Sequence, residues 1–260
     1  MGVGVVVQKF GGSSLSDEDG REAAVYKILK CRGEGNDVVV VVSAMGRRGA
    51  PYATDSLLDL VSCQGFSAKR EMDLLMSCGE IISAVVLASH IHRRTEDLTV
   101  LTGWQAGIVT DSNHGNANIL EVNPEKIKEL LELGNIVVVA GFQGATSDGT
   151  ITTLGRGGSD ITAAALGVAL AAERVEVYTD VNGVATCDPK VIPDAPVLTW
   201  LDYKTALELS NQGAKVLHPR AVEILYGKGI PLIVKNIKGD HPGTRIVPNS
   251  PNNPNNILLV

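Results

Sequence analysis

The sequence is poor in aromatic residues and in long apolar runs, and each shortage excludes a class of protein. Phe, Trp and Tyr make up 4% of its 260 residues, so we expect no platform for stacking nucleic-acid bases. The net charge is −6, from 23 Lys and Arg against 29 Asp and Glu, which argues against nucleic-acid and anionic-membrane partners. Apolar runs such as 38–42 and 136–140 are far shorter than the ~20 residues of a membrane-spanning helix.

Cysteine is also scarce, and its spacing excludes the usual metal and redox motifs. The four cysteines, Cys31, Cys63, Cys78 and Cys187, form no C-x-x-C pair, and the five histidines show no metal-ligand spacing. Residues 1–8 lead straight into a motif, with no signal-peptide pattern. We therefore expect reduced thiols, a cytoplasmic location and no metal site built from protein side chains.

Strand-like and helix-like segments alternate along the chain. The strand-like segments are 3–8, 38–42, 98–101, 136–142, 175–179 and 231–235. The helix-like segments are 16–32, 54–61, 69–91 with a break near Gly79, 124–134, 160–172, 202–212 and 219–226. The all-valine run 38–42 is typical of a strand that is buried on both faces. The alternation predicts an α/β fold, a three-layer α/β/α sandwich around a mostly parallel central sheet.

Four candidate motifs follow directly after predicted strands. They are Lys9–Ser14, Ser43–Gly46, Gly141–Gly144 and Thr179–Gly183. In a parallel sheet the carboxyl ends of the strands meet at one edge, and ligands bind there. We therefore expect these motifs to form a single ligand-binding rim.

Two glycine-rich turns, Lys9–Ser14 and Gly155–Asp160, carry the strongest chemical signal. Each leads into a helix-like run, and backbone N–H groups at a helix N-terminus hold phosphate oxygens. Neither turn is a Walker A motif. Lys9 at a strand end can neutralise charge on a transferring phosphoryl group, or it can be a solvated lysine beside a structural turn. The pair of turns indicates phosphoryl transfer.

The turn Gly155–Asp160 allows two interpretations. Ser159 or Asp160 can cap the following helix, which would be a structural role. Alternatively, Asp160 orients Lys9, and Arg156 binds a carboxylate through its planar guanidinium. An arginine among three glycines has few structural duties, which favours contact with a ligand.

Three further positions are ambiguous when considered alone. Thr179–Gly183 with Lys190 can meet a nucleotide, or it can be an Asx-turn loop. Glu80 lies between helical runs, where a glutamate is normally solvated. Lys215 precedes the helix that starts at Pro219, and no structural role evident in the sequence explains a lysine there.

Seven segments, in order, resemble the aspartate kinases of the amino-acid kinase superfamily. They are KFGGSS, VVVVSAMG, LLMSCGE, GFQGAT, TTLGRGGSD, YTDVNGVATCDPK and GAKVLHPRAVE. The resemblance covers residues 5 to about 245 and implies ATP-dependent phosphorylation of the β-carboxylate of L-aspartate, with Mg²⁺ accompanying ATP. It implies that Lys9 and Asp160 are the catalytic pair. The residues implied to bind aspartate are Ser43, Thr54, Glu80, Arg156 and Ser159. Those implied to bind the nucleotide are Lys9, Gly11, Gly12, Ser13, Thr179, Asp180, Lys190 and Lys215.

The resemblance also implies an organisation of the chain. Residues 1–245 would form the catalytic domain, with a lobe of about 1–145 binding aspartate and a lobe of about 146–245 binding ATP. Residues 246–260 would be a linker or tail where paired ACT domains follow in the family. The chain would then be either a piece of a longer protein or a natural short form, and we expect a homodimer.

Two positions differ from the common pattern of the family. Ala185 stands where many members have Tyr, and Lys190 stands where Arg is common, so a bidentate phosphate contact becomes a point charge. Two alternatives stay open: a paralogue that phosphorylates another small carboxylate or amino acid, and a catalytically silent nucleotide-binding regulator.

Overall fold

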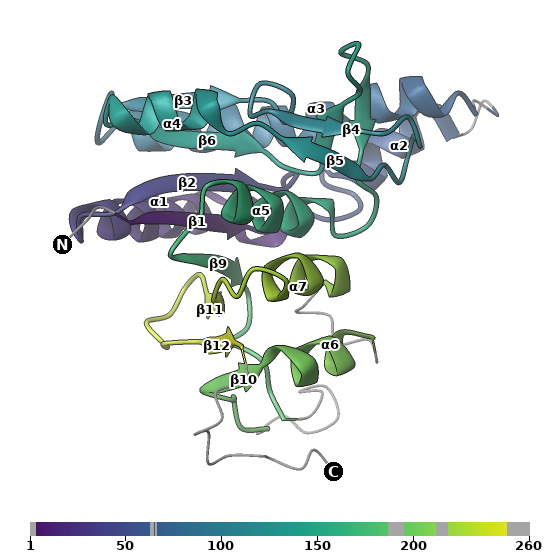
Figure 1. Cartoon of the computed structure of the whole chain (residues 1–260). Helices are drawn as coiled ribbons and strands as arrows, with labels where there is room; N and C mark the ends of the chain where they lie inside the picture. Colours follow the sequence, from purple (N-terminus) through teal and green to yellow (C-terminus); the bar gives the residue numbers. More distant parts are fainter. Residues whose placement is uncertain (1–3, 63–64, 66, 187–194, 212–217, 249–260) are drawn as a thin grey trace.

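The computed structural model describes residues 4–62, 65, 67–186, 195–211 and 218–248. An eight-stranded sheet forms its centre (Figure 1), and only the β11–β12 pairing in it is antiparallel. The strand order is β10 (Trp200–Asp202), β12 (Thr244–Val247), β11 (Leu232–Asn236), β9 (Arg174–Thr179), β1 (Val5–Phe10), β2 (Asp37–Val42), β6 (Ile136–Ala140), β3 (Leu98–Leu101). The predicted mostly parallel central sheet is confirmed.

Helices cover both faces of this sheet. The apolar side chains of α1 (Glu18–Gly33) and α3 (Lys69–His92) pack on one face. The other face carries α4 (Glu125–Glu132), α5 (Gly158–Ala169), α6 (Tyr203–Asn211) and α7 (Pro219–Tyr226). The valines of β2 alternate between the two cores, because successive side chains of a strand point to opposite faces. The architecture is the expected three-layer α/β/α sandwich.

A second sheet of four short strands was not predicted. Its order is β5 (Ile119–Val122), β4 (Ile108–Thr110), β7 (Gln143–Ala145), β8 (Ile151–Thr153). Strand β8 contacts α3, which also contacts α2 (Thr54–Ser62), and Figure 1 shows β4 and β5 in the upper part of the molecule. Each strand has only three or four residues, too few to establish an alternating pattern in the sequence.

Helix α3 runs without interruption through Gly79, so the predicted break there is wrong. A Cβ atom at position 79 would lie 2.9 Å from the Cβ of Ala44 and 3.0 Å from the carbonyl oxygen of Tyr52. Glycine is therefore present because another segment approaches the helix closely, and not because the helix ends.

By length and composition alone, α3 could cross a membrane, which differs from the expectation based on uninterrupted apolar runs. It has 24 residues, and its most apolar window has a mean hydropathy of 1.8. In this fold 56% of that window is buried, and Ala84, Leu87 and Ile91 lie in the core beneath the sheet. These are the properties of a core helix as well as of a membrane span.

The helix starts differ from expectation at two motifs. Asp17 caps α1, one residue after the predicted start of this helix, since its Oδ1 accepts a 2.7 Å hydrogen bond from the N–H of Gly20. Gly157, in the left-handed region with φ 71°, is the N-cap of α5, so neither Ser159 nor Asp160 caps that helix. The Asp160 carboxylate is consequently available for another partner.

Candidate active site

Lys9 and Asp160 form an ion pair at the rim of the main sheet. Lys9 lies near the carboxyl end of β1, and Asp160 lies in the first turn of α5. The Lys9 Nζ is 2.7 Å from the Asp160 Oδ1, and the two side chains are 11% and 23% exposed. The contact expected from the sequence is therefore present, and it fixes a lysine ammonium group beside the start of a helix.

The loop after β2 is hydrogen-bonded to the glycine turn that follows Lys9 and packs closely against it. The N–H of Gly46 donates a 2.9 Å hydrogen bond to the carbonyl of Gly12. A Cβ atom at position 12 would lie 2.2 Å from the carbonyl oxygen of Ala44, so only glycine permits this approach. Ser43, half-buried at the start of the loop, is thereby held beside the turn that contains Gly11 and Gly12.

Glu80 brings a buried carboxylate to the same loop. It lies on α3 with 2% exposure, and its Oε1 accepts a 3.0 Å hydrogen bond from the N–H of Ala44. Burial raises the pKa of Glu80 to about 8, against the opposing effect of the Ala44 hydrogen bond. Its Oε2 has no hydrogen-bond partner among the described residues. This buried, unsatisfied acceptor is suited to a cation such as an ammonium group.

The turn before α5 presents one exposed and one buried side chain. Arg156 is exposed, whereas Ser159 is 6% exposed. Ser159 packs so closely on Gly141 that a Cβ atom at position 141 would lie 2.8 Å from its Oγ. Gly141 directly follows β6, so this contact places the α5 N-terminus against the strand ends. No ion pair holds Arg156 within the described part of the chain, so its guanidinium can reach an anionic ligand.

At the end of β9, Asp180 pairs with a residue that the sequence analysis missed. The Arg47 Nη2 lies 3.0 Å from the Asp180 Oδ2, and both side chains are largely exposed. The hydroxyl of Thr179 donates a 3.1 Å hydrogen bond to the other Asp180 oxygen. Arg47 follows β2, so its position after a strand at the predicted rim was a signal that could have found it.

The remaining sequence candidates are less informative. Ser13 lies in η1 (Gly12–Leu15), and Thr54 is the first residue of α2; both are half-buried. Ala185 forms an isolated antiparallel bridge with Val197. Lys190 and Lys215 lie outside the described residues.

Asp73 is a buried carboxylate that the sequence analysis also missed. It is 0% exposed and accepts hydrogen bonds from Nδ1 of His114 at 2.8 Å and from Oγ1 of Thr153 at 2.5 Å. The N–H of Gly115 lies 3.1 Å from both carboxylate oxygens. Asp73 lies seven residues before Glu80, two turns earlier on the same side of α3, and that spacing was the available signal.

We expect Asp73→Asn to destabilise the fold and to disturb the turn that carries Arg156. Thr153 ends β8 just before Gly155, and an Asn side chain cannot accept from all three donors because one of its terminal atoms is itself a donor. The expected loss is about 3 kcal/mol of unfolding free energy, measured by urea unfolding. An unchanged urea midpoint would contradict this role, and Glu132→Gln, at an exposed position at the end of α4, serves as the control.

His218 lies near the Lys9–Asp160 pair and was overlooked because only Lys215 was considered in its motif. A Cβ atom at position 157 would lie 2.0 Å from the His218 ring, so the ring packs directly on the N-cap of α5. Burial lowers the pKa of His218; Asp160 raises it, while Arg220 and Lys9 lower it. A neutral imidazole therefore forms one wall of the site near neutral pH.

The carboxylates of Asp160 and Asp180 fit a metal ion only if a bound nucleotide supplies further ligands. Among the described residues, no three His, Cys, Asp or Glu side chains gather into a metal site. Asp160 and Asp180 are already paired with Lys9 and Arg47. Since Mg²⁺ commonly binds through one or two carboxylates together with substrate phosphates and water, these residues fit a Mg²⁺ that is held largely by phosphate oxygens.

The chain is similar in sequence and fold to known proteins. Residues 4–236 match the model of the amino acid kinase family. The chain is 49% identical over 243 residues to aspartokinase 1 of Bacillus subtilis, covering 93% of the chain and 60% of that protein. It thus spans about 60% of the length of such curated relatives.

Two crystal structures have similar folds. Aspartate kinase from Synechocystis has a TM-score of 0.81 and 43% identity, and the match covers 94% of this chain and 40% of that one. E. coli aspartokinase III in complex with aspartate and ADP has a TM-score of 0.76 and 27% identity, with coverage of 95% and 65%.

Proposed function

This chain belongs to the amino acid kinase family, and we propose that it phosphorylates the β-carboxylate of L-aspartate with ATP, giving 4-phospho-L-aspartate. This reaction is the first step toward lysine, threonine and methionine. The observation that carries the proposal is the placement of the Lys9–Asp160 pair and the unsatisfied Glu80 carboxylate around one rim. The similarity to an aspartokinase solved with aspartate and ADP supports the choice of substrates.

The proposed chemistry needs no general base. A carboxylate with a pKa of ~3.9 is already ionised at neutral pH. One of its oxygens attacks the γ-phosphorus, the new O–P bond forms, and the bond to the bridging oxygen breaks with its electron pair leaving on ADP. Catalysis then consists of positioning and charge neutralisation. Lys9 supplies positive charge at the transferring group, and Asp160 holds Lys9 in place.

The acceptor side of the rim fits an α-amino acid. Glu80 offers its unsatisfied oxygen to the substrate ammonium group, and Arg156 offers a planar guanidinium to the α-carboxylate. Ser43, Thr54 and Ser159 complete the proposed aspartate site. An ammonium group beside Glu80 would return the raised pKa of this carboxyl toward its ordinary value.

The nucleotide side of the rim is proposed to consist of loops around β1 and β9. Gly11, Gly12 and Ser13 lie beside Lys9, where backbone amides can face phosphates. Thr179 and Asp180 follow β9, and Lys190 and Lys215 are proposed to complete the contacts. Mg²⁺ bound with ATP would supply further neutralisation of phosphate charge.

The proposal extends to the organisation of the protein. The aspartate site would belong to a lobe of about residues 1–145, and the ATP site to a lobe of about 146–245. We propose a cytoplasmic homodimer with no nucleic-acid or membrane partner.

A coupled assay of ADP release tests the proposal against its alternatives. We expect turnover with L-aspartate and none above background with L-glutamate, N-acetyl-L-glutamate or UMP. Turnover with one of the other acceptors alone would instead identify a paralogue of different specificity. ATP binding without turnover on any acceptor would favour a silent regulator, and Lys9→Met serves as the inactive control.

A further inference from the structure

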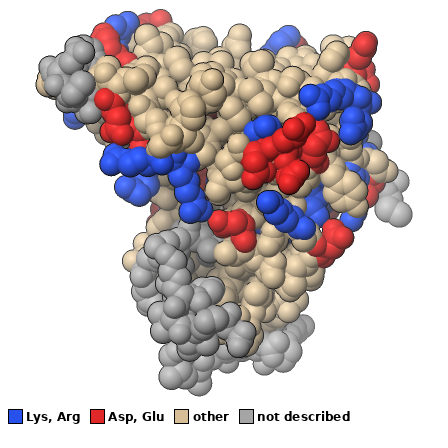
Figure 2. Space-filling model, turned by 180° about the vertical axis from the view of Figure 1, so that it is seen from behind, with Lys and Arg blue, Asp and Glu red and all other residues tan. Residues whose placement is uncertain are grey.

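A cavity lies on the face of the main sheet that α1 and α3 cover only in part. Its volume is about 740 Å³. Strands β9, β11 and β12 form its floor, α1 forms one wall, and residues 239–243 and 199–200 form the others. The cavity is on the side of the molecule that Figure 2 presents, where Lys and Arg lie beside Asp and Glu across the middle of the surface.

This cavity is separate from the candidate active site. Gln8 lines the cavity, whereas its neighbour Lys9 pairs with Asp160 on the other side of the sheet. Adjacent residues of a strand point to opposite faces, so the two sites share β1 but open on different sides of it.

Positive charge is concentrated in the cavity although the chain as a whole carries a net charge of −6. The lining contains five Lys and Arg residues against three Asp and Glu residues. They are Lys27, Lys30, Arg174, Lys235 and Arg245, and Glu34, Glu176 and Asp240. The lining thus has a local excess of two positive charges.

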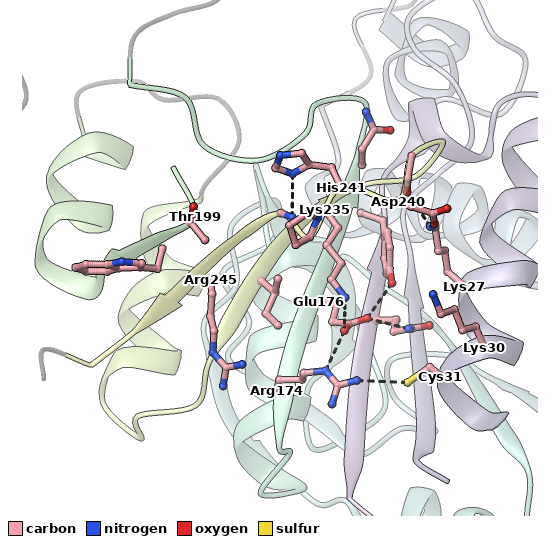
Figure 3. A pocket seen from close by; sticks show the side chains of 18 of the residues that line it. Lys27, Lys30, Cys31, Arg174, Glu176, Thr199, Lys235, Asp240, His241 and Arg245 are labelled. Carbon is pink, nitrogen blue, oxygen red and sulfur yellow. Dashed lines mark hydrogen bonds and ion pairs between the residues drawn. The ribbon is translucent and has the colours of Figure 1, made fainter. Parts of the chain in front are cut away.

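The buried floor is a fixed network around Glu176. Glu176 is 2% exposed, and its carboxylate lies 2.9 Å from Arg174 Nε and 2.8 Å from Lys235 Nζ (Figure 3). These two cations hold the pKa of Glu176 at about 2 despite its burial. Gln8 and Tyr178 each donate a further 2.9 Å hydrogen bond to it. The network holds Arg174 and Lys235 in place before any ligand binds.

Unused hydrogen-bonding capacity remains at this floor. The Oε1 atom of Gln8, a residue that is 0% exposed, has no hydrogen-bond partner among the described residues. Burial raises the pKa of the neighbouring Cys31 thiol to about 12, so this side chain stays uncharged. Native structures rarely leave a buried polar atom unsatisfied without a reason, such as a missing water or ligand.

Two further cations lie at the cavity edge. Lys30 and Arg245 are exposed, and within the described part of the chain neither makes an ion pair. Trp200, Ile233 and Val247 add apolar surface to the same cavity. Figure 3 shows Lys30 on the α1 side and Arg245 on the opposite side. We infer that the cavity is a second ligand site, for a small organic anion that carries an apolar or aromatic group beside a phosphate or carboxylate.

Trp200 provides a reporter within the site. The chain has two tryptophans, so Trp104→Phe leaves Trp200 as the only one. We expect phenyl phosphate to change the Trp200 emission in a saturable manner, and inorganic phosphate and benzyl alcohol to bind at least about tenfold more weakly, since each lacks one of the two interactions. Equal binding of either control compound, or no saturable change, would overturn the inference.

Two variants connect binding to this cavity. In the Trp104→Phe background, Lys30→Ala with Arg245→Ala is expected to raise the Kd for phenyl phosphate at least about tenfold, as expected when two charge contacts are lost. The matched control, Lys204→Ala with Lys228→Ala, removes two exposed lysines elsewhere and should leave the Kd unchanged. An unchanged Kd in the first pair, or an equal loss in the second, would refute the assignment.

A further variant separates this site from the catalytic one. Lys9→Ala in the Trp104→Phe background is expected to leave the Trp200 response unchanged, because Lys9 faces the other side of the sheet. Loss of the response in this variant would mean that phenyl phosphate acts from the catalytic rim, which would also overturn the inference. The measurement uses no turnover, so its outcome is independent of the proposed kinase activity.

Discussion

Lys9→Met is expected to lower the kcat for aspartate phosphorylation about 10²–10³-fold, the usual effect of removing one preorganised electrostatic contact from a transition state. Met keeps most of the volume of the mostly buried Lys9 side chain but cannot neutralise the transferring phosphoryl group. The measurement is steady-state ADP release with saturating ATP and L-aspartate. A variant that keeps full kcat would refute the catalytic role of Lys9.

Asp160, the partner of Lys9, provides a second test of this prediction. Asp160→Asn should also reduce kcat, because it leaves Lys9 without the carboxylate that lies 2.7 Å from it. Two residues that act as one unit have non-additive effects. We therefore expect the double variant to lose much less activity than the product of the two single losses. Fully multiplicative losses would mean that the two residues act independently.

Glu80→Gln is expected to lower kcat/KM for L-aspartate about 10²-fold while leaving the KM for ATP unchanged. The substitution keeps the shape of the side chain but removes the charge proposed to meet the substrate ammonium group. Losing one partner of a buried charge pair typically costs a few kcal/mol. If the KM for ATP rose by a similar factor, the substitution would have damaged the site as a whole.

Although Glu80→Gln lowers activity, it should stabilise the substrate-free protein at neutral and higher pH. The pKa of Glu80 is raised from its ordinary value of 4.5 to about 8 in the fold, mainly by burial. The contribution of protonated Glu80 to the free energy of unfolding is thus complete below about pH 4.5 and is lost as the pH rises toward 8. Relative to Glu80→Gln, the wild-type protein should become less stable across this interval, by an amount on the order of a few kcal/mol.

Urea unfolding of both proteins at several pH values between 5 and 8.5 measures this difference directly. Saturating L-aspartate should reduce the pH dependence in the wild-type protein, since the ammonium group compensates the buried carboxylate. A pH-independent difference between the two proteins would contradict the raised pKa of Glu80. Glu121→Gln, at an exposed position of β5, provides a control without buried charge.

Several parts of the site could be predicted because their signals are local in the sequence. Lys9 and Asp160 were identified from two glycine turns beside strand-like and helix-like runs, and the structure brings them into contact. The position of Ser43 followed from the rule that loops at the carboxyl ends of parallel strands meet. The family assignment rested on seven motifs in order, and the family match confirms it.

Other parts could not be predicted because their partners are distant in the sequence. Asp73 is satisfied by Thr153 and by the His114–Gly115 segment, and nothing near Asp73 in the sequence indicates those donors. The predicted break at Gly79 was wrong for a related reason: the glycine accommodates Ala44 and Tyr52 rather than ending a helix. The four short strands of the second sheet contain too few residues for a recognisable period.

The sequence by itself determined the class of fold, the location of the rim and the residue types available there. Apolar periodicity and glycine turns express local backbone preferences, and these depend on neighbouring residues alone. Only the tertiary structure decided which oxygen of Glu80 remains unsatisfied, that Asp160 faces Lys9 instead of capping α5, and that a cationic cavity opens on the opposite face. Those properties depend on burial and on contacts between distant segments, which exist only once the chain has folded.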